Sequence, residues 1–107
     1  MEDKKTTGRV RELTGILKDC TVMEVTATTW APYYAKGDML FVHPESKVAI
    51  RDRVSLTTRN GRHILGACIE KGNKQTVVQS FDGILKFEHF DESDIASVSK
   101  IIAAVYQ

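Results

Sequence analysis

The fold class of this 107-residue chain is decided by one stretch, Arg53-Val54-Ser55-Leu56-Thr57-Thr58-Arg59-Asn60-Gly61. Its first seven residues alternate in polarity and are rich in β-branched side chains, which is typical of a half-buried strand. Asn60-Gly61 is the strongest short-range signal for a two-residue hairpin, in which both turn residues have φ above zero. Residues 62–70 alternate again, so the sequence predicts a second strand that pairs with the first.

Short β-rich runs continue on both sides of this hairpin and are separated by turn residues. These runs cover residues 21–27, 39–43, 75–79, 84–88 and 98–105. Residues 91–94 are typical of a loop or a single helical turn, and the last run is apolar enough to be buried. Six or seven short strands predict an all-β domain of coiled, partly barrel-like antiparallel sheets.

The N-terminal part of the chain lacks this β pattern. Residues 1–8 are polar and are interpreted as a flexible tail, and residues 9–107 are interpreted as a single domain. Within residues 9–19 we expect a short helical turn or an irregular lead-in, because Gly15 interrupts a short apolar pattern. That pattern places four apolar residues on one face of a helix: Val10, Leu13, Ile16 and Leu17.

Composition narrows the class of protein. Lys and Arg number 15 against 14 Asp and Glu, so a net charge of +1 argues against a nucleic-acid-binding domain in this stretch alone. The chain contains no apolar run long enough for a membrane span, and residues 1–5 lack the apolar core of a signal peptide, which favours the cytoplasm. Cys20 and Cys68 are expected to be free thiols.

The loop before the second predicted strand carries the most specific motif. It reads Thr28-Thr29-Trp30-Ala31-Pro32-Tyr33-Tyr34-Ala35-Lys36-Gly37-Asp38 and leads into the hydrophobic run 39–42. This frame resembles the nucleophile loop of the LexA/phage CI-type repressors, whose C-terminal domains have a signal-peptidase-like serine peptidase fold. In that family Asp-Ser-Met-x-Pro precedes Gly-Asp and a hydrophobic strand. Here Thr28-Thr29-Trp30 stands in place of Asp-Ser-Met.

The resemblance extends over residues 10–106. Residues 33–44 are similar to the phage-type repressors of α-proteobacteria, and residues 13–15 and 22–25 resemble the lead-in to the nucleophile loop. Arg51 stands where that family usually has glycine, before the start of a strand. Residues 94–102 resemble the closing element of the family, so the resemblance implies a LexA C-terminal-like domain of the β-clip type.

The same resemblance implies that the catalytic dyad is lost. Thr29 aligns with the serine nucleophile, and its extra methyl group restricts χ1 and crowds attack. Gly66 aligns with the lysine base, and no lysine lies between Arg62 and Glu70. We therefore expect no enzyme activity; a residual self-cleaving peptidase that uses Thr29 and Lys71 is the third alternative.

The resemblance also implies where partners bind. The cleft or partner site would comprise Thr28, Thr29, Trp30, Pro32 and Tyr33, where Trp30 either fills the inert cleft or anchors a peptide. The dimer contacts would involve the C-terminal residues Ile101, Ile102, Val105 and Tyr106. The charged residues from Arg51 to Arg53, with Arg59 and Arg62, read as a solvated face or as the rim of an interface.

Three functions follow from these expectations. The first is a non-catalytic dimerisation domain of a phage-type transcriptional repressor, or of a headless homologue, that reaches DNA only through a separate N-terminal domain. The second is an inert peptidase-like cleft that binds a peptide or a full-length repressor. The third is the residual peptidase.

The spacing of His43, His63 and His89 matches no metal site, and we expect neither a metal nor a cofactor.

Overall fold

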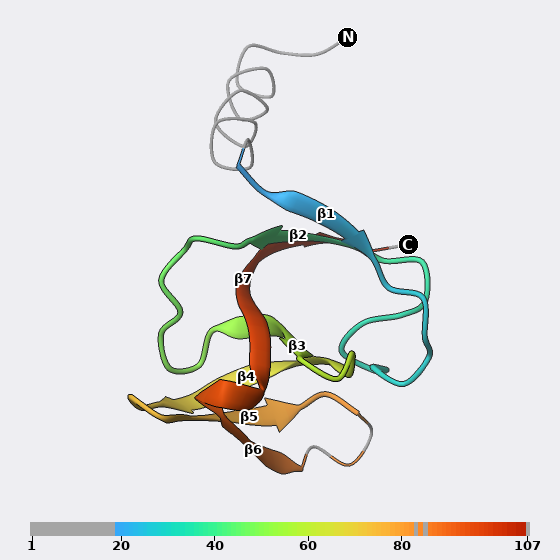
Figure 1. The fold of residues 1–107 in the computed structure, drawn as a ribbon. Helices are drawn as coiled ribbons and strands as arrows, with labels where there is room; N and C mark the ends of the chain where they lie inside the picture. Colours follow the sequence, from blue (N-terminus) through green and yellow to red (C-terminus); the bar gives the residue numbers. More distant parts are fainter. Residues whose placement is uncertain (1–18, 83, 85, 107) are drawn as a thin grey trace, which may run out of the picture.

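The computed structural model describes residues 19–82, 84 and 86–106, which form one open, seven-stranded antiparallel sheet (Figure 1). The strands are β1 (Thr21–Glu24), β2 (Met39–His43), β3 (Arg53–Thr58), β4 (His63–Lys71), β5 (Gln75–Ser80), β6 (Phe87–Asp91) and β7 (Ile95–Val105). Their order in the sheet is β1-β2-β7-β3-β4-β5-β6, so β1 and β6 are the edges and the sheet does not close into a barrel. The all-β prediction is confirmed.

The long strand β7 joins the two parts of the sheet. Its first half pairs with β3 and its second half pairs with β2. Each pairing contains a register shift that leaves one extra residue on β7, Ala96 beside β3 and Ile102 beside β2. Such bulges bend a strand and increase its twist. Figure 1 shows β7 curving from the layer of β3 to β6 up to the layer of β1 and β2.

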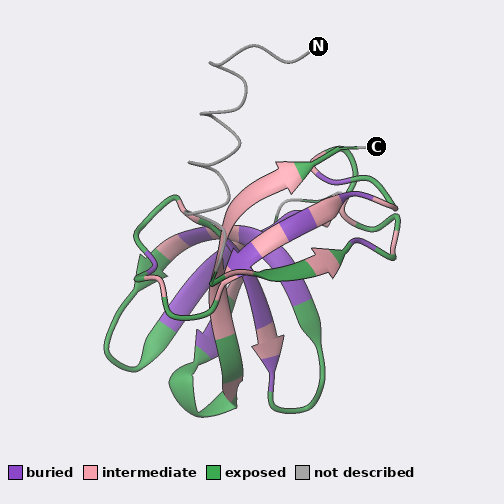
Figure 2. Ribbon diagram, turned by 90° about the horizontal axis from the view of Figure 1, so that it is seen from above, coloured by how far each residue is buried: buried purple, intermediate pink, exposed green. Residues whose placement is uncertain are grey.

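Two hydrophobic clusters occupy the two faces of the bent sheet. The first comprises Val48, Val54, Leu56, Ile64, Cys68, Val78 and Phe90. The second comprises Val25, Tyr34, Leu40, Val42, Leu65 and Phe81. Neighbouring residues on one strand point to opposite faces, which is why Ile64 and Leu65 enter different clusters. In Figure 2 the buried residues lie mainly along the central strands.

The β3–β4 turn differs from the predicted two-residue hairpin. Gly61 has a φ of 91°, but Asn60 does not share the positive φ that the prediction required. The Gly61 amide donates to the Thr58 carbonyl at 3.0 Å, and the Thr58 amide donates to the Arg62 carbonyl at 2.8 Å. The Thr58 hydroxyl also hydrogen-bonds the Asn60 side chain and accepts from the Arg62 amide. These side-chain bonds favour a longer turn, in which only the glycine needs positive φ.

Three strand ranges also differ from those predicted. The first strand was expected at 21–27 and ends at Glu24, where the loop to β2 begins. The strand expected at 84–88 lies at Phe87–Asp91, because its register with β5 places Phe90 in the first core and leaves Ile84 outside. The last strand begins at Ile95 rather than at residue 98, because pairing with β3 extends it.

The last strand is also less buried than predicted, because Ile101 to Ala104 are only half-buried. The expected loop or helical turn at 91–94 is a 3-10 turn at Glu92–Asp94. The expected tail at 1–8 and the helical turn before residue 19 lie outside the described residues.

Candidate functional site

The loop between β1 and β2 continues the pairing of these strands and then folds over the second core. The Val25 amide donates to the Asp38 carbonyl at 2.8 Å, and the Gly37 amide donates to the Val25 carbonyl at 2.7 Å. Asp38 is buried, and its Oδ2 accepts from the Ala35 amide at 2.8 Å. Gly37 has a φ of 99°, a conformation that favours glycine. The Gly-Asp pair of the motif therefore closes the loop.

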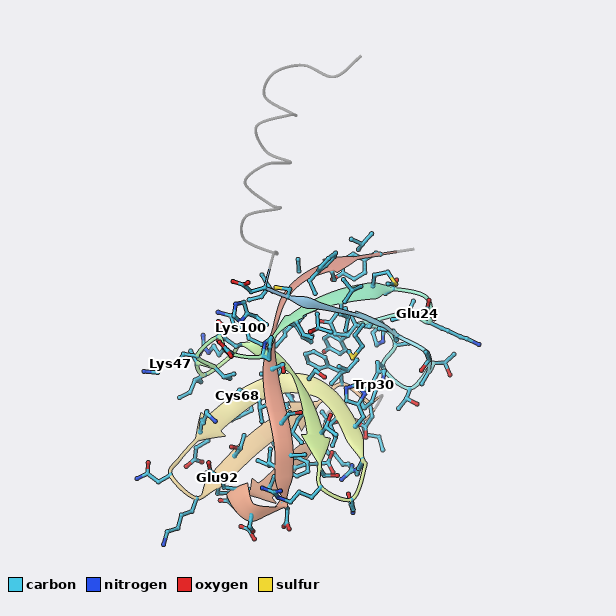
Figure 3. The ribbon with its side chains drawn as sticks, turned by 45° about the horizontal axis from the view of Figure 1, so that its top comes forward. Glu24, Trp30, Lys47, Cys68, Glu92 and Lys100 are labelled. Atoms are coloured by element: carbon cyan, nitrogen blue, oxygen red, sulfur yellow. The ribbon has the colours of Figure 1, made fainter. Side chains whose placement is uncertain are left out.

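The structure divides the predicted cleft residues into exposed and packed ones. Thr28, Thr29 and Pro32 are exposed, and the Ala31–Pro32 peptide bond is cis. Trp30 is half-buried and packs against both hydrophobic clusters. Figure 3 shows Trp30 between the layer of β1 and β2 and the layer below it. A tryptophan in this position fills the space between the two parts of the sheet.

Gly66 lies where β4 and β5 approach each other closely. A Cβ atom on Gly66 would lie 2.4 Å from the Gln79 carbonyl oxygen and 2.6 Å from Val78 Cγ1. Both distances are below any ordinary van der Waals contact, and the nearer atom belongs to the backbone. The position aligned with the lysine base therefore has no room for a side chain unless the strands move apart.

Lys71, the other lysine considered as a base, lies at the far end of β4. It pairs with Thr76 and is exposed. A strand rises about 3.3 Å per residue, so Lys71 lies roughly 15 Å along β4 from Gly66. It borders a pocket of about 280 Å³ with the first residues of β7, Ile95 and Ala96 among them.

Arg53 organises a cluster of aromatic side chains beside the loop. Its guanidinium carbon lies 5.8 Å from the ring centroid of Tyr33, 5.5 Å from that of Tyr34 and 5.3 Å from that of Phe81. Tyr33 stacks on Phe81 with centroids 4.2 Å apart, so this predicted cleft residue lies within the cluster. Cation–π contacts with three rings hold the loop against the start of β3.

The hydroxyl of Tyr34 is the polar centre of this cluster. Arg53 donates a hydrogen bond to it at 3.3 Å, which raises the pKa of the guanidinium. Burial raises the pKa of Tyr34 and outweighs the opposing effect of Arg53. The Tyr106 ring stacks on Tyr34 with centroids 6.5 Å apart. Both groups therefore keep their usual protonation states at neutral pH, a cation and a neutral phenol.

A shallow pocket of about 170 Å³ joins this cluster to the last strand. Its lining residues are Tyr34, Arg53, Ile101, Ile102, Ala103, Ala104 and Tyr106. Three of the four predicted dimer residues, all but Val105, thus border the same depression as the cluster. The alternating sequence pattern did not indicate this role of Arg53, which read as part of a charged face.

The side of β1, β2 and β7 that faces away from the second core carries mostly apolar residues. In the strand register, Val22 lies beside Phe41 and Phe41 beside Ala103, while Met39 lies beside Val105. Val22 and Val105 expose 50% and 51% of their surface, and the other three are half-buried. We call these five residues the outer face.

The four predicted dimer residues do not share one surface. Ile101 packs against the second core, and Ile102 is the extra residue of the β7 bulge. Val105 belongs to the outer face, whereas Tyr106 is 61% exposed and stacks on Tyr34. Of this set only Val105 projects from the face opposite the core.

A serine and a histidine pair across the β3–β4 hairpin. Ser55 Oγ lies 2.7 Å from His63 Nε2. Ser55 is buried, and partial burial of the imidazole lowers the pKa of His63. The bond satisfies the buried Ser55 hydroxyl, and the tautomer of His63 sets which of the two groups donates.

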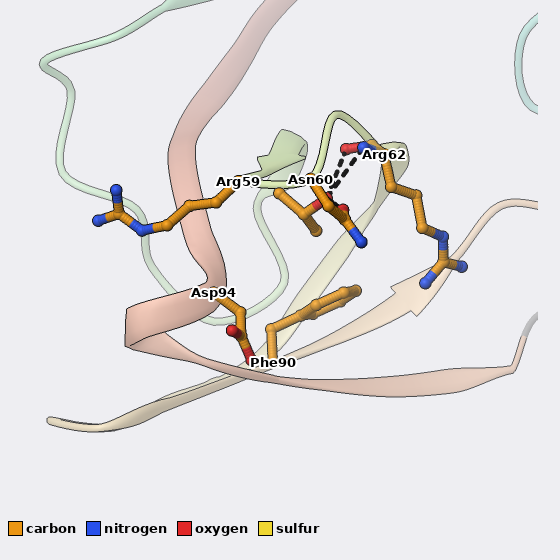
Figure 4. Close-up of a pocket in the computed structure, with 6 residues that line it drawn as sticks. Arg59, Asn60, Arg62, Phe90 and Asp94 are labelled. Carbon is orange, nitrogen blue, oxygen red and sulfur yellow. Dashed lines mark hydrogen bonds between the residues drawn. The ribbon is translucent and has the colours of Figure 1, made fainter.

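The tip of the β3–β4 hairpin borders a pocket of about 370 Å³ (Figure 4). Arg62 forms an ion pair with Glu88 at 2.6 Å, and Arg59 Nε donates to the Ser93 carbonyl at 2.7 Å. Figure 4 shows the two arginine side chains pointing away from each other. Because protein acceptors engage both side chains, they do not form a joint anion site.

Other site classes receive no support from the part of the chain that the structure describes. Within it, no three His, Cys, Asp or Glu side chains lie close enough to hold a metal ion. Cys20 and Cys68 are free thiols, and burial raises the pKa of Cys68. No helix among residues 19–82, 84 and 86–106 is long and apolar enough to cross a bilayer.

Comparison of the chain with models of known protein families and with curated protein sequences finds no match.

Proposed function

We propose that this chain is a non-catalytic self-association domain, similar in role to the C-terminal domains of LexA/CI-type repressors. The observation that carries the proposal is the outer face, where Val22 and Val105 are about half exposed. Apolar clusters on one side of a sheet are typical of protein–protein contact surfaces. Fully burying a side chain of this size contributes about 1.5–3 kcal/mol, so covering the exposed half contributes about 0.8–1.5 kcal/mol, and a two-fold contact counts each contribution twice.

The outer face has the layout of an interface centre. Phe41 lies in its middle, between Val22 and Ala103 in the register of the three strands. Glu24 and Lys100 lie near its two ends and are candidates for a polar rim. Protein–protein interfaces commonly have an apolar centre and a charged rim, because water leaves the centre on binding while the rim stays hydrated.

Two backbone features support the family resemblance on which the role is based. Arg51 has a φ of 78°, the left-handed conformation that glycine adopts without strain, and Arg51 stands where that family usually has glycine. The Gly-Asp pair closes the loop as its position in the motif suggests. Both features follow from local backbone requirements and do not depend on catalysis.

The absence of catalytic activity is part of the proposal. Gly66 has no room for a lysine side chain, and Lys71 lies near the other end of β4. The hydroxyl of Thr29 would therefore lack a base at the position where the family supplies one. In a repressor the domain would hold two DNA-reading heads at the spacing of adjacent half-sites.

The decisive experiment is the solution mass of the full chain by light scattering across a wide concentration range. The chain has a mass of 12.0 kDa, so a dimer is expected near 24 kDa. Val105→Asp should weaken the dimer at least tenfold, because it places a charge among the apolar side chains of the outer face, where the interface would bury it without a partner.

Ile84→Asp is the matched control for this charge. Ile84 is 81% exposed and lies beyond the other edge of the sheet, near β6. The Ile84→Asp substitution should therefore leave the dimer intact. A wild-type chain that remains near 12 kDa at every concentration would overturn the proposal.

A further inference from the structure

The second half of β7 has a neighbouring strand on one side only. In the sheet β7 lies between β2 and β3, and its pairing with β3 ends where Val54 lies opposite Lys100. Residues 101–105 continue beyond that pair, and within the described residues they pair with β2 alone. Figure 1 shows this half of β7 beside β2 and above β3. The side of residues 101–105 that faces away from β2 is therefore an unpaired strand edge, which we call the β7 edge.

The strand register identifies backbone groups that face this edge. The Val25 amide donates to the Asp38 carbonyl at 2.8 Å, so hydrogen-bonded pairs between β1 and β2 recur at every second residue from there. This alternation leaves Met39 and Phe41 to bond to β7 rather than to β1. Their partners are the residues on either side of Ala104, so Ala104 directs its own amide and carbonyl toward the β7 edge. An added strand could bond to both groups.

Arg53 supplies a positive charge at one end of the β7 edge. Its side chain is exposed, and neither of the ion pairs formed within the described residues involves it. The nearest carboxylate along the chain belongs to Asp52, which lies 3.5 Å from the Lys100 ammonium group. Arg53 instead contacts aromatic rings and the hydroxyl of Tyr34, which carry no negative charge. Its charge and its remaining N–H groups are therefore available to an anionic ligand.

The depression between Arg53 and β7 favours an extended chain over an enclosed small molecule. Its volume of about 170 Å³ is smaller than the roughly 300–1,000 Å³ that is usual for small-molecule pockets. Residues 101–104 line it along the strand, and Tyr106 lines it together with Arg53. Most of these lining side chains are apolar. The depression is therefore suited to one apolar side chain of a peptide that lies along β7.

The direction of β3 decides which end of a peptide would meet Arg53. Because β3 is antiparallel to β7 and begins at Arg53, a peptide that follows the direction of β3 along the β7 edge would end beside the guanidinium. Its α-carboxylate would then meet a cation. The opposite orientation would place the positive N-terminus of the peptide against Arg53, which Coulomb repulsion disfavours.

We infer that the β7 edge binds the extended C-terminus of a partner protein, antiparallel to β7, with the free carboxylate on Arg53 and an apolar side chain in the depression. The mode combines strand addition with capture of a terminal carboxylate. The site is separate from the outer face, so it does not depend on the proposed self-association.

Peptide binding to the full chain tests the inference by fluorescence anisotropy. The probe is a pool of fluorescein-labelled hexapeptides with a free C-terminal acid, in which the last four residues are drawn from valine, isoleucine, leucine and threonine. The matched pool ends in a carboxamide. The acid pool should bind at least about tenfold more tightly, because only the acid places a charge on the guanidinium. Equal affinities, or no saturable binding of the acid pool, would overturn the inference.

Arg53→Met tests whether this arginine recognises the carboxylate. The substitution keeps an apolar stem, and it should reduce the affinity ratio of acid to amide from at least about tenfold to near one. Arg59→Met is the matched control, because Arg59 is an exposed arginine near the other end of the same strand, and it should leave the ratio unchanged. A ratio that persists in Arg53→Met would overturn the assignment. Trp30 fluorescence reports the folding of both variants, since Trp30 packs against both cores.

Hydrogen exchange in the unmodified chain tests strand addition without any substitution. The Ala104 amide should exchange faster than the Ala103 amide, which bonds to β2. The acid pool should slow the exchange of Ala104 at least about tenfold. It should not affect His89, whose backbone faces the opposite edge of the sheet because the alternate residue Lys86 bonds to Ser80. Unchanged exchange of Ala104 with the acid pool bound would overturn strand addition.

The same measurements identify any other occupant. Slow exchange of Ala104 in the free protein at every concentration would show that its own chain covers the edge, and slow exchange only at high concentration would assign the edge to a second copy. Isovalerate carries a carboxylate and an apolar group without a peptide backbone, so it should bind about a hundredfold more weakly than the acid pool. Equal affinity would assign the site to small acids. Each of these three results would overturn the inference.

Discussion

Ser55 and His63 form a hydrogen bond of 2.7 Å across the β3–β4 hairpin, between a buried hydroxyl and an imidazole whose pKa is lowered by burial. The two residues are diagonal neighbours, because Ser55 pairs with Leu65 and Thr57 pairs with His63. A neutral imidazole takes part in this bond as acceptor or as donor, whereas a charged imidazolium can only donate. The pair therefore links the protonation of one side chain to the stability of the hairpin.

The first prediction concerns pH. Because the pKa of His63 is lower in the folded than in the unfolded chain, the unfolded chain binds more protons as the pH falls below about 6.5. The contribution of His63 is fully present above that value and is lost as the pH falls toward the folded pKa. Urea unfolding should thus show a larger loss of stability between pH 7.5 and 5.5 in the wild type than in His63→Gln. Equal losses in the two proteins would refute this linkage.

The second prediction concerns Gly66. Gly66→Ala should destabilise the fold by about 3 kcal/mol. Overpacking a tight site costs about 1–3 kcal/mol, and the upper end of this range applies because backbone atoms move aside less readily than side-chain atoms. Gly72→Ala is the control, because a Cβ there would lie 3.5 Å from the Gln75 carbonyl oxygen, an ordinary contact. Urea midpoints measure both changes. A Gly66→Ala protein as stable as Gly72→Ala would show that β4 and β5 separate easily, and a lysine could then be accommodated.

The third prediction concerns the positive φ of Arg51. A non-glycine residue in the left-handed region costs about 1–2 kcal/mol, whereas glycine gains unfolded-state entropy of about 0.5–1 kcal/mol. Arg51→Gly should therefore be more stable than Arg51→Ala by about 0.5–1 kcal/mol, because both variants lose the same side-chain contacts. Thermal unfolding of the two variants gives the comparison. Greater stability of the alanine variant would contradict the positive φ.

The fourth prediction separates the two roles considered for Trp30. Because Trp30 packs against both cores, Trp30→Ala should destabilise the fold by about 3 kcal/mol, and Trp30→Phe should cost less. An exposed anchor for a peptide would behave differently, since its loss leaves stability almost unchanged. Urea unfolding of the three proteins decides between filling the space and anchoring a ligand.

Several elements follow from local sequence alone. The strands at 39–43, 53–58 and 75–80 match their predicted ranges to within one residue, because alternation and flanking turn residues are local properties. The position of the β3–β4 turn was predicted as well. Its detailed form was not, because the Thr58 side chain bonds both Asn60 and Arg62 and selects a longer turn.

The site depends more strongly on distant contacts. Thr29 and Trp30 were recognised from the motif, but only packing shows that Trp30 contacts both cores while Thr29 is exposed. The sequence pattern placed Arg53 in an exposed, charged face. Its three ring contacts arise because Tyr33, Tyr34 and Phe81 come from two loops that meet beside the start of β3.

The sequence by itself determined the all-β class and the position of the central hairpin, because both depend on the conformational preferences of neighbouring residues. Only the tertiary structure decided that β7 pairs with both β2 and β3 and bends at Ala96 and Ile102. That bend places Val105 on the outer face and Tyr106 against Tyr34. Strand register between distant segments depends on the whole set of side-chain contacts, and no local pattern encodes it.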